Sequence, residues 1–240
     1  MKKYFIKMAA VAVAVTAVLS FSNQSEMETG KEKWITLFDG KTFNGWHLYN
    51  QTGAIKNWTI EEDAMVCLGA AADAHGGDIV TDELFSAFEL QFEFRLTEGA
   101  NSGVKYFVTE KEQSSGSAIG LEYQVLDDEK HPDAKLGTAG NRTLGGLYDL
   151  IPPIKYGQAY RQIGDWNRGM IRVYKDNHVE HFLNGYKIVE YQRGSQMFRA
   201  LVARSKYNVW PDFGEAKEGR ILLQDHGNAV DFRSIKIKTL

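Results

Sequence analysis

Side chains that could perform acid–base or metal chemistry gather in residues 120–128, which read Gly-Leu-Glu-Tyr-Gln-Val-Leu-Asp-Asp. Apolar residues alternate with Glu122 and Gln124 in this stretch. Because successive side chains of a strand point to opposite faces, the two polar side chains share one face and the apolar ones face a core. The stretch therefore predicts a strand whose polar face is the floor of a groove. A half-solvated strand that ends in an acidic turn is the alternative.

The acidic side chains of this stretch favour some chemistries over others. Glu122, Asp127 and Asp128 offer the oxygen ligands that Ca²⁺ or Mg²⁺ prefers, so a divalent cation is a candidate cofactor. An ordinary glycosidase needs a pair of carboxyl groups that flank the scissile bond. Sandwich-fold β-glucanases place them on one strand as E-x-D-x-E or E-x-D-x-x-E, whereas this strand reads Glu-x-Gln-x-x-Asp. The spacing argues against ordinary double displacement at this strand.

Histidine and lysine side chains supply candidate bases. The six histidines are scattered, with no cysteine partner and no His-x-x-x-His spacing, so the sequence does not predict a local zinc site. His181 lies shortly before the dipeptide Asn184-Gly185, and its imidazole titrates near neutral pH, which suits a general base. The same position suits a structural histidine that holds the turn. His226 and Lys206 allow the same two interpretations.

Strand patterns dominate the chain that must position these residues. Residues 88–96 alternate Phe or Leu with Glu, Gln or Arg, which is typical of an antiparallel strand with one solvated face. Asn184-Gly185 predicts a hairpin, because a type I′ turn needs positive φ at both central residues. Near Arg233-Ser234 the alternation changes phase, which predicts a β-bulge. Many short strands without a long helical period predict an all-β fold, a two-sheet antiparallel β-sandwich.

One domain is predicted from residue 34 to residue 240, because no Pro-, Ser- or Gly-rich linker divides the chain. Its longest irregular segment, residues 127–146, is a candidate functional loop. Residues 198–204 fit either a strand or a short helix. Cys67 is the only cysteine, so the core must be held without an internal disulfide.

The first residues predict export. Lys2, Lys3 and Lys7 precede an apolar run over residues 8–19, which is too short for a comfortable membrane span. We predict a signal peptide over residues 1–22, a polar lead-in over 23–33, and a periplasmic or extracellular protein without stable membrane insertion after cleavage. An uncleaved anchor is the alternative. Lys and Arg total 28 against 31 Asp and Glu, with no basic run, so nucleic acid is not a predicted partner.

Short motifs along nearly the whole domain resemble those of one family. Residues 34–46 read Trp-Ile-Thr-Leu-Phe-Asp-Gly-Lys-Thr-Phe-Asn-Gly-Trp. Further motifs follow in order: Asn-Ser-Gly-Val at 101–104, Glu-Tyr-Gln at 122–124, Gly-Leu-Tyr-Asp at 146–149, Trp-Asn at 166–167, Val-Glu-His at 179–181, Leu-Asn-Gly at 183–185 and Leu-Gln-Asp-His-Gly at 223–227. In these motifs the chain resembles the 3-keto-disaccharide hydrolase family.

This resemblance implies a concanavalin A-like jelly roll with a sugar-binding concave face, export to the periplasm, and cleavage of glycosides already oxidised to a ketone at carbon 3. Such a ketone acidifies the proton on carbon 2. A base removes that proton, an enolate forms, the aglycone leaves from carbon 1, and water can add back to give net hydrolysis. The site needs a base, an enolate stabiliser and an acid for the leaving group. A sugar 3-dehydrogenase that supplies the substrate is the implied functional partner.

Under this interpretation we predict His181 as the base, with Glu122 orienting it or polarising the ketone through a bound cation. Lys206 or Glu122 is the next candidate. Asn101 and Lys105 share a parity on the neighbouring strand and should join Glu122. The predicted saccharide-binding residues are Asn101, Lys105, Gln124, Asp127, Asp149 and His226. A non-catalytic carbohydrate-binding module and a conventional glycoside hydrolase stay open as alternatives, because sandwich folds host both lectins and enzymes.

Overall fold

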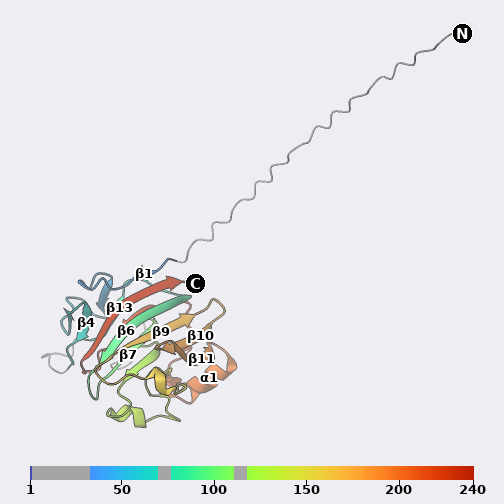
Figure 1. The fold of residues 1–240 in the computed structure, drawn as a ribbon. Coiled ribbons are helices and arrows are strands. Elements are labelled where there is room, and N and C mark those ends of the chain that lie inside the picture. Colours follow the sequence, from blue (N-terminus) through green and yellow to red (C-terminus); the bar gives the residue numbers. More distant parts are fainter. Residues whose placement is uncertain (2–32, 70–76, 111–117) are drawn as a thin grey trace. The chain divides into compact units, whose positions relative to one another are not determined.

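The computed structural model describes residue 1 and residues 33–69, 77–110 and 118–240 (Figure 1). Residues 32–240 group into one compact unit. Residues 2–32, which make up nearly all of the predicted signal peptide and lead-in, lie outside the described residues. Within the described ranges, no helix is long and apolar enough to cross a membrane.

The larger of two antiparallel sheets brings together strands from both ends of the domain. Figure 1 shows β13 beside β6, with β9, β10 and β11 following across the sheet. In the described part of the chain its order is β11 (Tyr186–Gln192), β10 (His178–Leu183), β9 (Trp166–Val173), β6 (Phe88–Leu96), β13 (Val230–Thr239), β4 (Ala64–Cys67) and β3 (Trp58–Glu61), and β1 (Ile35–Thr36) also pairs with β13.

The smaller sheet carries the alternating stretch over residues 120–128. Its order, over the described residues, is β2 (Trp46–Leu48), β5 (Ile79–Thr81), β12 (Arg220–Leu223), β7 (Asn101–Val108) and β8 (Leu121–Leu126). The sequence patterns above do not indicate β5, which is only three residues long. Its strand conformation depends on hydrogen bonding to β2 and β12, because its three residues are too few to show a strand pattern.

The core lies between the two sheets, where aromatic side chains from both meet. On β6, Phe88, Phe92 and Phe94 are almost fully buried, as the alternation over residues 88–96 predicts. The ring of Phe92 meets that of Tyr123 from β8 edge-on, with centroids 5.3 Å apart. Tyr106 of β7 meets Phe88 in the same way at 6.4 Å. The predicted two-sheet antiparallel β-sandwich is therefore confirmed.

Irregular features follow local sequence signals. The register of β13 against β6 shifts between Arg233 and Lys236, and Ser234 has a φ of 53°, so the predicted bulge is present. Asn184 and Gly185 both have positive φ, as the predicted hairpin turn requires. The 198–204 segment lies largely in a helix, α1 (Gln196–Ala203), which Ser195 caps by accepting a hydrogen bond from the Phe198 N–H.

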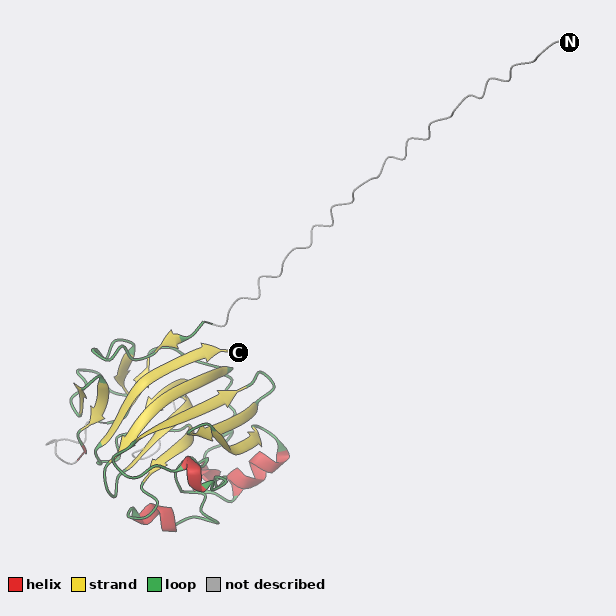
Figure 2. Cartoon of the chain, viewed as in Figure 1, coloured by secondary structure: helices red, strands yellow, loops and turns green. Residues whose placement is uncertain are grey.

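Short helical turns complete the fold. Figure 2 shows α1 and the main helical turns in the lower part of the view, where Figure 1 labels α1 beside β11. The helical segments that lie wholly within the described residues are α1 and the 3₁₀ turns η2 (Pro132–Lys135), η3 (Gly157–Ala159) and η4 (Lys206–Val209). The turns η2 and η3 belong to the long connection between β8 and β9, and η4 follows α1. This placement brings Lys206 near the smaller sheet.

Candidate active site

The outer face of the smaller sheet, which points away from the core, carries a row of buried polar side chains. Lys105 of β7 is paired directly opposite Glu122 of β8. The Lys105 Nζ lies 3.8 Å from the Glu122 Oε2 and donates a hydrogen bond to the Ala118 carbonyl at 3.1 Å. Both residues are buried, so each charge needs the other to offset its loss of hydration. The predicted alternation of β8 holds, and Glu122 and Gln124 on its polar face are buried rather than half-solvated.

A glycine shapes this face beside the ion pair. Gly103 of β7 lies opposite Gln124, and a Cβ built on Gly103 would stand 2.4 Å from the Glu122 Oε1. The Glu122 carboxylate therefore lies over the space that the missing side chain leaves. Beside it, the Asn101 Oδ1 and the Gln124 Nε2 are buried without a hydrogen-bond partner among the described residues. Buried polar atoms normally have partners, so these two are suited to receive a ligand or water.

Residues 145–149 extend the sheet beside β8. Tyr148 and Asp149, together with Asp133 and Arg142, form a polar wall beside this face. The Gln124 N–H donates to the Gly146 carbonyl at 3.1 Å, and the Tyr148 N–H to the Glu122 carbonyl at 3.0 Å. Asp149, with a φ of 61°, then accepts hydrogen bonds at both oxygens: from the Arg142 Nε at 2.7 Å and from the Lys206 backbone N–H at 2.8 Å. Asp149 thus joins the loop to η4, and its predicted contact with saccharide stays a prediction.

Three residues of this wall were missed by the sequence analysis. Arg142 also pairs with Asp133 at 2.9 Å, and the Tyr148 hydroxyl donates to the other oxygen of Asp133 at 2.8 Å. Arg142 and Asp133 lie in the long irregular segment that was flagged as functional, and Tyr148 lies two residues beyond it. The irregular segment is a signal for Arg142 and Asp133, and the motif at 146–149 is a signal for Tyr148, but neither indicates the contacts, which join residues that no periodicity relates.

Lys206 points its ammonium group toward this wall. Its Nζ lies 4.2 Å from the centroid of the Tyr148 ring and 5.2 Å from that of Tyr207. The side chain remains accessible to solvent. Packing of protein around the ammonium lowers the pKa of Lys206, and the negative charge of Glu122 opposes this shift. A lysine with a lowered pKa is a candidate general base.

His181 does not lie with these residues, so Glu122 does not orient it as the sequence analysis predicts. It shares its strand parity with Val179 and Leu183, and all three are buried between the sheets. The His181 Nδ1 is 3.0 Å from the Gly145 carbonyl, and its Nε2 is 2.9 Å from the Tyr106 hydroxyl. Burial lowers the pKa of His181 to about 4. The parity was a readable signal, and it indicates a structural histidine.

The predicted cation ligands do not converge either. The Asp127 carboxylate accepts hydrogen bonds from the N–H groups of Gly99, Glu129 and Lys130 at 2.8 to 3.2 Å, so it caps a turn. The Asp128 carboxylate holds the Leu144 N–H at 2.7 Å. Neither carboxylate joins Glu122, and Asp127 is occupied by backbone rather than free for a saccharide.

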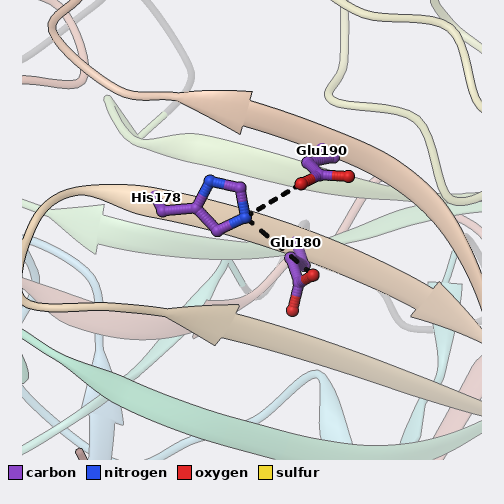
Figure 3. Close-up of side chains that lie close together, drawn as sticks. All are labelled: His178, Glu180 and Glu190. Carbon is purple, nitrogen blue, oxygen red and sulfur yellow. Dashed lines mark ion pairs between the residues drawn. The ribbon is translucent and has the colours of Figure 1, made fainter.

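A different cluster places metal-ligating side chains together, on the outer face of the larger sheet. His178 lies between Glu180 and Glu190, with its Nε2 3.9 Å and 3.1 Å from their carboxylates (Figure 3). Arg172 and Lys187 also contact these carboxylates. Because two cations already balance the two carboxylates, the cluster forms an ion-pair network, and we assign no metal to it.

His226 lies in the turn after β12, where its ring meets that of His131 with centroids 6.0 Å apart. His226 is exposed. Burial, together with the charge of His226, lowers the pKa of His131.

Comparison with known proteins agrees with this architecture. Residues 33–238 match the family model described as a 3-keto-alpha-glucoside-1,2-lyase-like domain. A 3-keto-disaccharide hydrolase of Bacteroides thetaiotaomicron is 36% identical over 255 residues, covering 96% of this chain and 87% of the relative.

Solved structures give the same result. A crystal structure from Parabacteroides distasonis, named as a glycosyl hydrolase, has 32% identity and a TM-score of 0.73, covering 86% of this chain and 94% of that one. A second from the same organism, at 23% identity with a TM-score of 0.65, shares the fold and covers 87% of this chain and all of that one. The chain therefore belongs to the 3-keto-disaccharide hydrolase family.

Proposed function

We propose that this protein is an exported enzyme that cleaves 3-keto-glycosides by elimination between carbons 1 and 2, followed by addition of water. Family membership supports a carbohydrate hydrolase. The observation that carries the finer proposal is the position of Lys206, an accessible lysine with a lowered pKa that faces the buried Lys105–Glu122 pair. A base and a fixed positive charge are what enolate chemistry requires.

Each residue of the site has a role in this proposal. Lys206, as a neutral amine, removes the proton on carbon 2. Lys105 places a positive charge where the enolate oxygen develops, and Glu122 holds that charge in position. Asp149 fixes Lys206 by accepting its backbone N–H. His181 is not used as a base, because both ring nitrogens are hydrogen-bonded inside the core.

The substrate defines the functional partner. A glycoside with a ketone at carbon 3 arises by oxidation of the ordinary glycoside, so a sugar 3-dehydrogenase must act before this enzyme. Export places the reaction in the periplasm or outside the cell, in accordance with the predicted signal peptide over residues 1–22.

One assay tests the function against its alternatives. The purified protein is offered a plain disaccharide and its 3-keto form. We expect cleavage of the keto form alone. Cleavage of the plain sugar would instead identify a conventional glycoside hydrolase, and binding without turnover of either sugar would identify a carbohydrate-binding module.

A substitution tests the base. Lys206→Gln should lower turnover of the 3-keto-glycoside on the order of a hundredfold or more, the usual scale for losing a general base. Exchange of the carbon-2 proton with deuterated solvent should fall equally. Lys175→Gln is the matched control, because Lys175 is an exposed lysine in the turn after β9. Near-normal exchange in Lys206→Gln would show that another group is the base.

A further inference from the structure

We propose that Asp78 is the general acid that protonates the leaving aglycone oxygen. This inference rests on the proposed elimination, which needs such an acid and to which none of the residues above contributes one. Asp78 lies one residue before β5, outside every motif singled out in the sequence. Its assignment therefore depends on where the sheet places it.

Strand register puts Asp78 on the same face as the base and the ion pair. Val80 of β5 is paired with Leu222 of β12, and Leu222 is paired with Lys105 of β7. Residues paired directly across strands point to the same side, so Val80 shares the outer face with Lys105. Asp78 precedes Val80 by two residues, which returns its side chain to that face.

The polar side chains of this face lie across four neighbouring strands of the smaller sheet. The strands run in the order β5, β12, β7, β8, so Asp78 and Glu122 are separated by three strand spacings, about 14 Å between backbones. The Glu122 carboxylate leans back over Gly103, toward the Asp78 side. The charges of both Lys105 and Glu122 act on the Asp78 carboxyl group. In this proposal the glycosyl unit lies between Lys206 and Asp78.

The surroundings of Asp78 favour its protonated form. Burial raises the pKa of Asp78, and the charge of Lys105 and a hydrogen bond from the Asp225 N–H partly offset this. That N–H donates to the Asp78 Oδ1 at 2.8 Å. Because Oδ1 is held in this way, Oδ2 is the oxygen left to carry a proton. The titratable groups that act on Asp78 are Lys105 from β7, Glu122 from β8, Asp225 from the segment after β12, Cys67 from β4, and Tyr49, which follows β2.

The step balances in atoms and electrons. Lys206 takes the proton from carbon 2, and the electron pair of that bond becomes the enolate of the carbon-3 ketone. The enolate then returns its electrons to form the double bond between carbons 1 and 2. The bond from carbon 1 to the aglycone oxygen breaks, and that oxygen takes the proton from the Asp78 Oδ2. Solvent restores the proton on Asp78 and accepts the proton from Lys206, and no oxidant or reductant is consumed.

Asp78→Asn tests this role, because the amide keeps the size of the side chain and an oxygen for the Asp225 N–H. The wild type and the variant are compared on 4-nitrophenyl and methyl 3-keto-glucosides. A nitrophenolate leaves without protonation, whereas a methoxide needs an acid. We expect release of methanol to fall on the order of a hundredfold or more, and release of nitrophenol to fall by less than about tenfold. Carbon-2 exchange with deuterated solvent should persist, because the base is intact.

The control is Asp82→Asn, the same chemical change at an exposed carboxylate that pairs with His47. It should turn over both substrates normally. Equal losses on both substrates, with loss of carbon-2 exchange, would overturn the acid role and indicate that Asp78 only supports the structure. Unchanged release of methanol would overturn it as well. If the wild-type protein turns over neither keto-glucoside, the proposed function itself fails, and that result is distinct from a failure of Asp78 alone.

Discussion

Acidification should destabilise this protein through His181. The ring is fully buried, and each of its nitrogens has a hydrogen-bond partner. Nδ1 contacts the Gly145 carbonyl, and Nε2 contacts the Tyr106 hydroxyl. Since a carbonyl only accepts, Nδ1 carries the proton, Nε2 accepts from Tyr106, and the ring is neutral. A second proton at Nε2 would remove that acceptor and place a charge in the core.

The size of the effect follows from the two pKa values. The pKa of His181 is about 4 in the folded protein and 6.5 for an unperturbed histidine. Because the folded value is the lower one, the unfolded chain binds the proton first. The stability that the neutral ring contributes is complete above pH 6.5 and is lost as the pH falls toward 4. The free energy of unfolding should fall by about 2 kcal/mol between about pH 7.5 and about pH 5 from this group alone.

Urea unfolding followed by tryptophan fluorescence measures this loss. The wild type is compared with His181→Gln, which does not titrate, and with His226→Gln, which removes an exposed histidine. His181→Gln should be less stable at neutral pH, yet should lose about 2 kcal/mol less than the wild type on acidification. His226→Gln should follow the wild type. If the wild type and His181→Gln lose equal stability between the two pH values, the ring is not held neutral in the core and the reasoning is refuted.

Two further predictions concern Gly103 and Cys67. Gly103→Ala should lower turnover of a 3-keto-glycoside by up to about a hundredfold, because its Cβ would stand 2.4 Å from the Glu122 Oε1 and displace that carboxylate. Gly157→Ala, where a Cβ meets nothing within 4 Å, should leave the rate unchanged, and equal rates in both variants would contradict the proposed position of Glu122. The Cys67 thiol should not react with a thiol reagent in the native protein at mildly alkaline pH, because burial raises its pKa to about 12. Urea should restore its reactivity, and rapid labelling without urea would show that the thiol is accessible.

The sequence by itself determined the all-β architecture and much of its local detail. The alternation in β6 and β8 assigns each side chain to a face, because the period of a strand is fixed by backbone geometry. Positive φ at Asn184 and the bulge at Ser234 follow from turn chemistry and a change of phase. These signals are local, so a single sequence is enough to read them.

The alternation of side chains along a strand also indicates that the His181 side chain points into the core. Its parity with Val179 and Leu183 predicts an inward side chain, and the structure shows one. The prediction of a catalytic base rests on the pKa of free histidine, which lies near neutral pH, and not on the alternation of buried residues in this strand. That pKa is the value for a solvated ring, and burial lowers the pKa of His181.

Only the tertiary structure decided which polar residues meet. Lys105 and Glu122 lie on adjacent strands, and their shared parity made the pairing predictable. Asp78 lies just before a strand that was not predicted, Lys206 begins a 3₁₀ turn, and Tyr148 lies in the loop that pairs with β8. Such contacts depend on strand order and on loop paths, which are set by packing across the whole sheet rather than by any local period. The sequence alone therefore determines the face on which this chemistry lies, and the fold determines the partners.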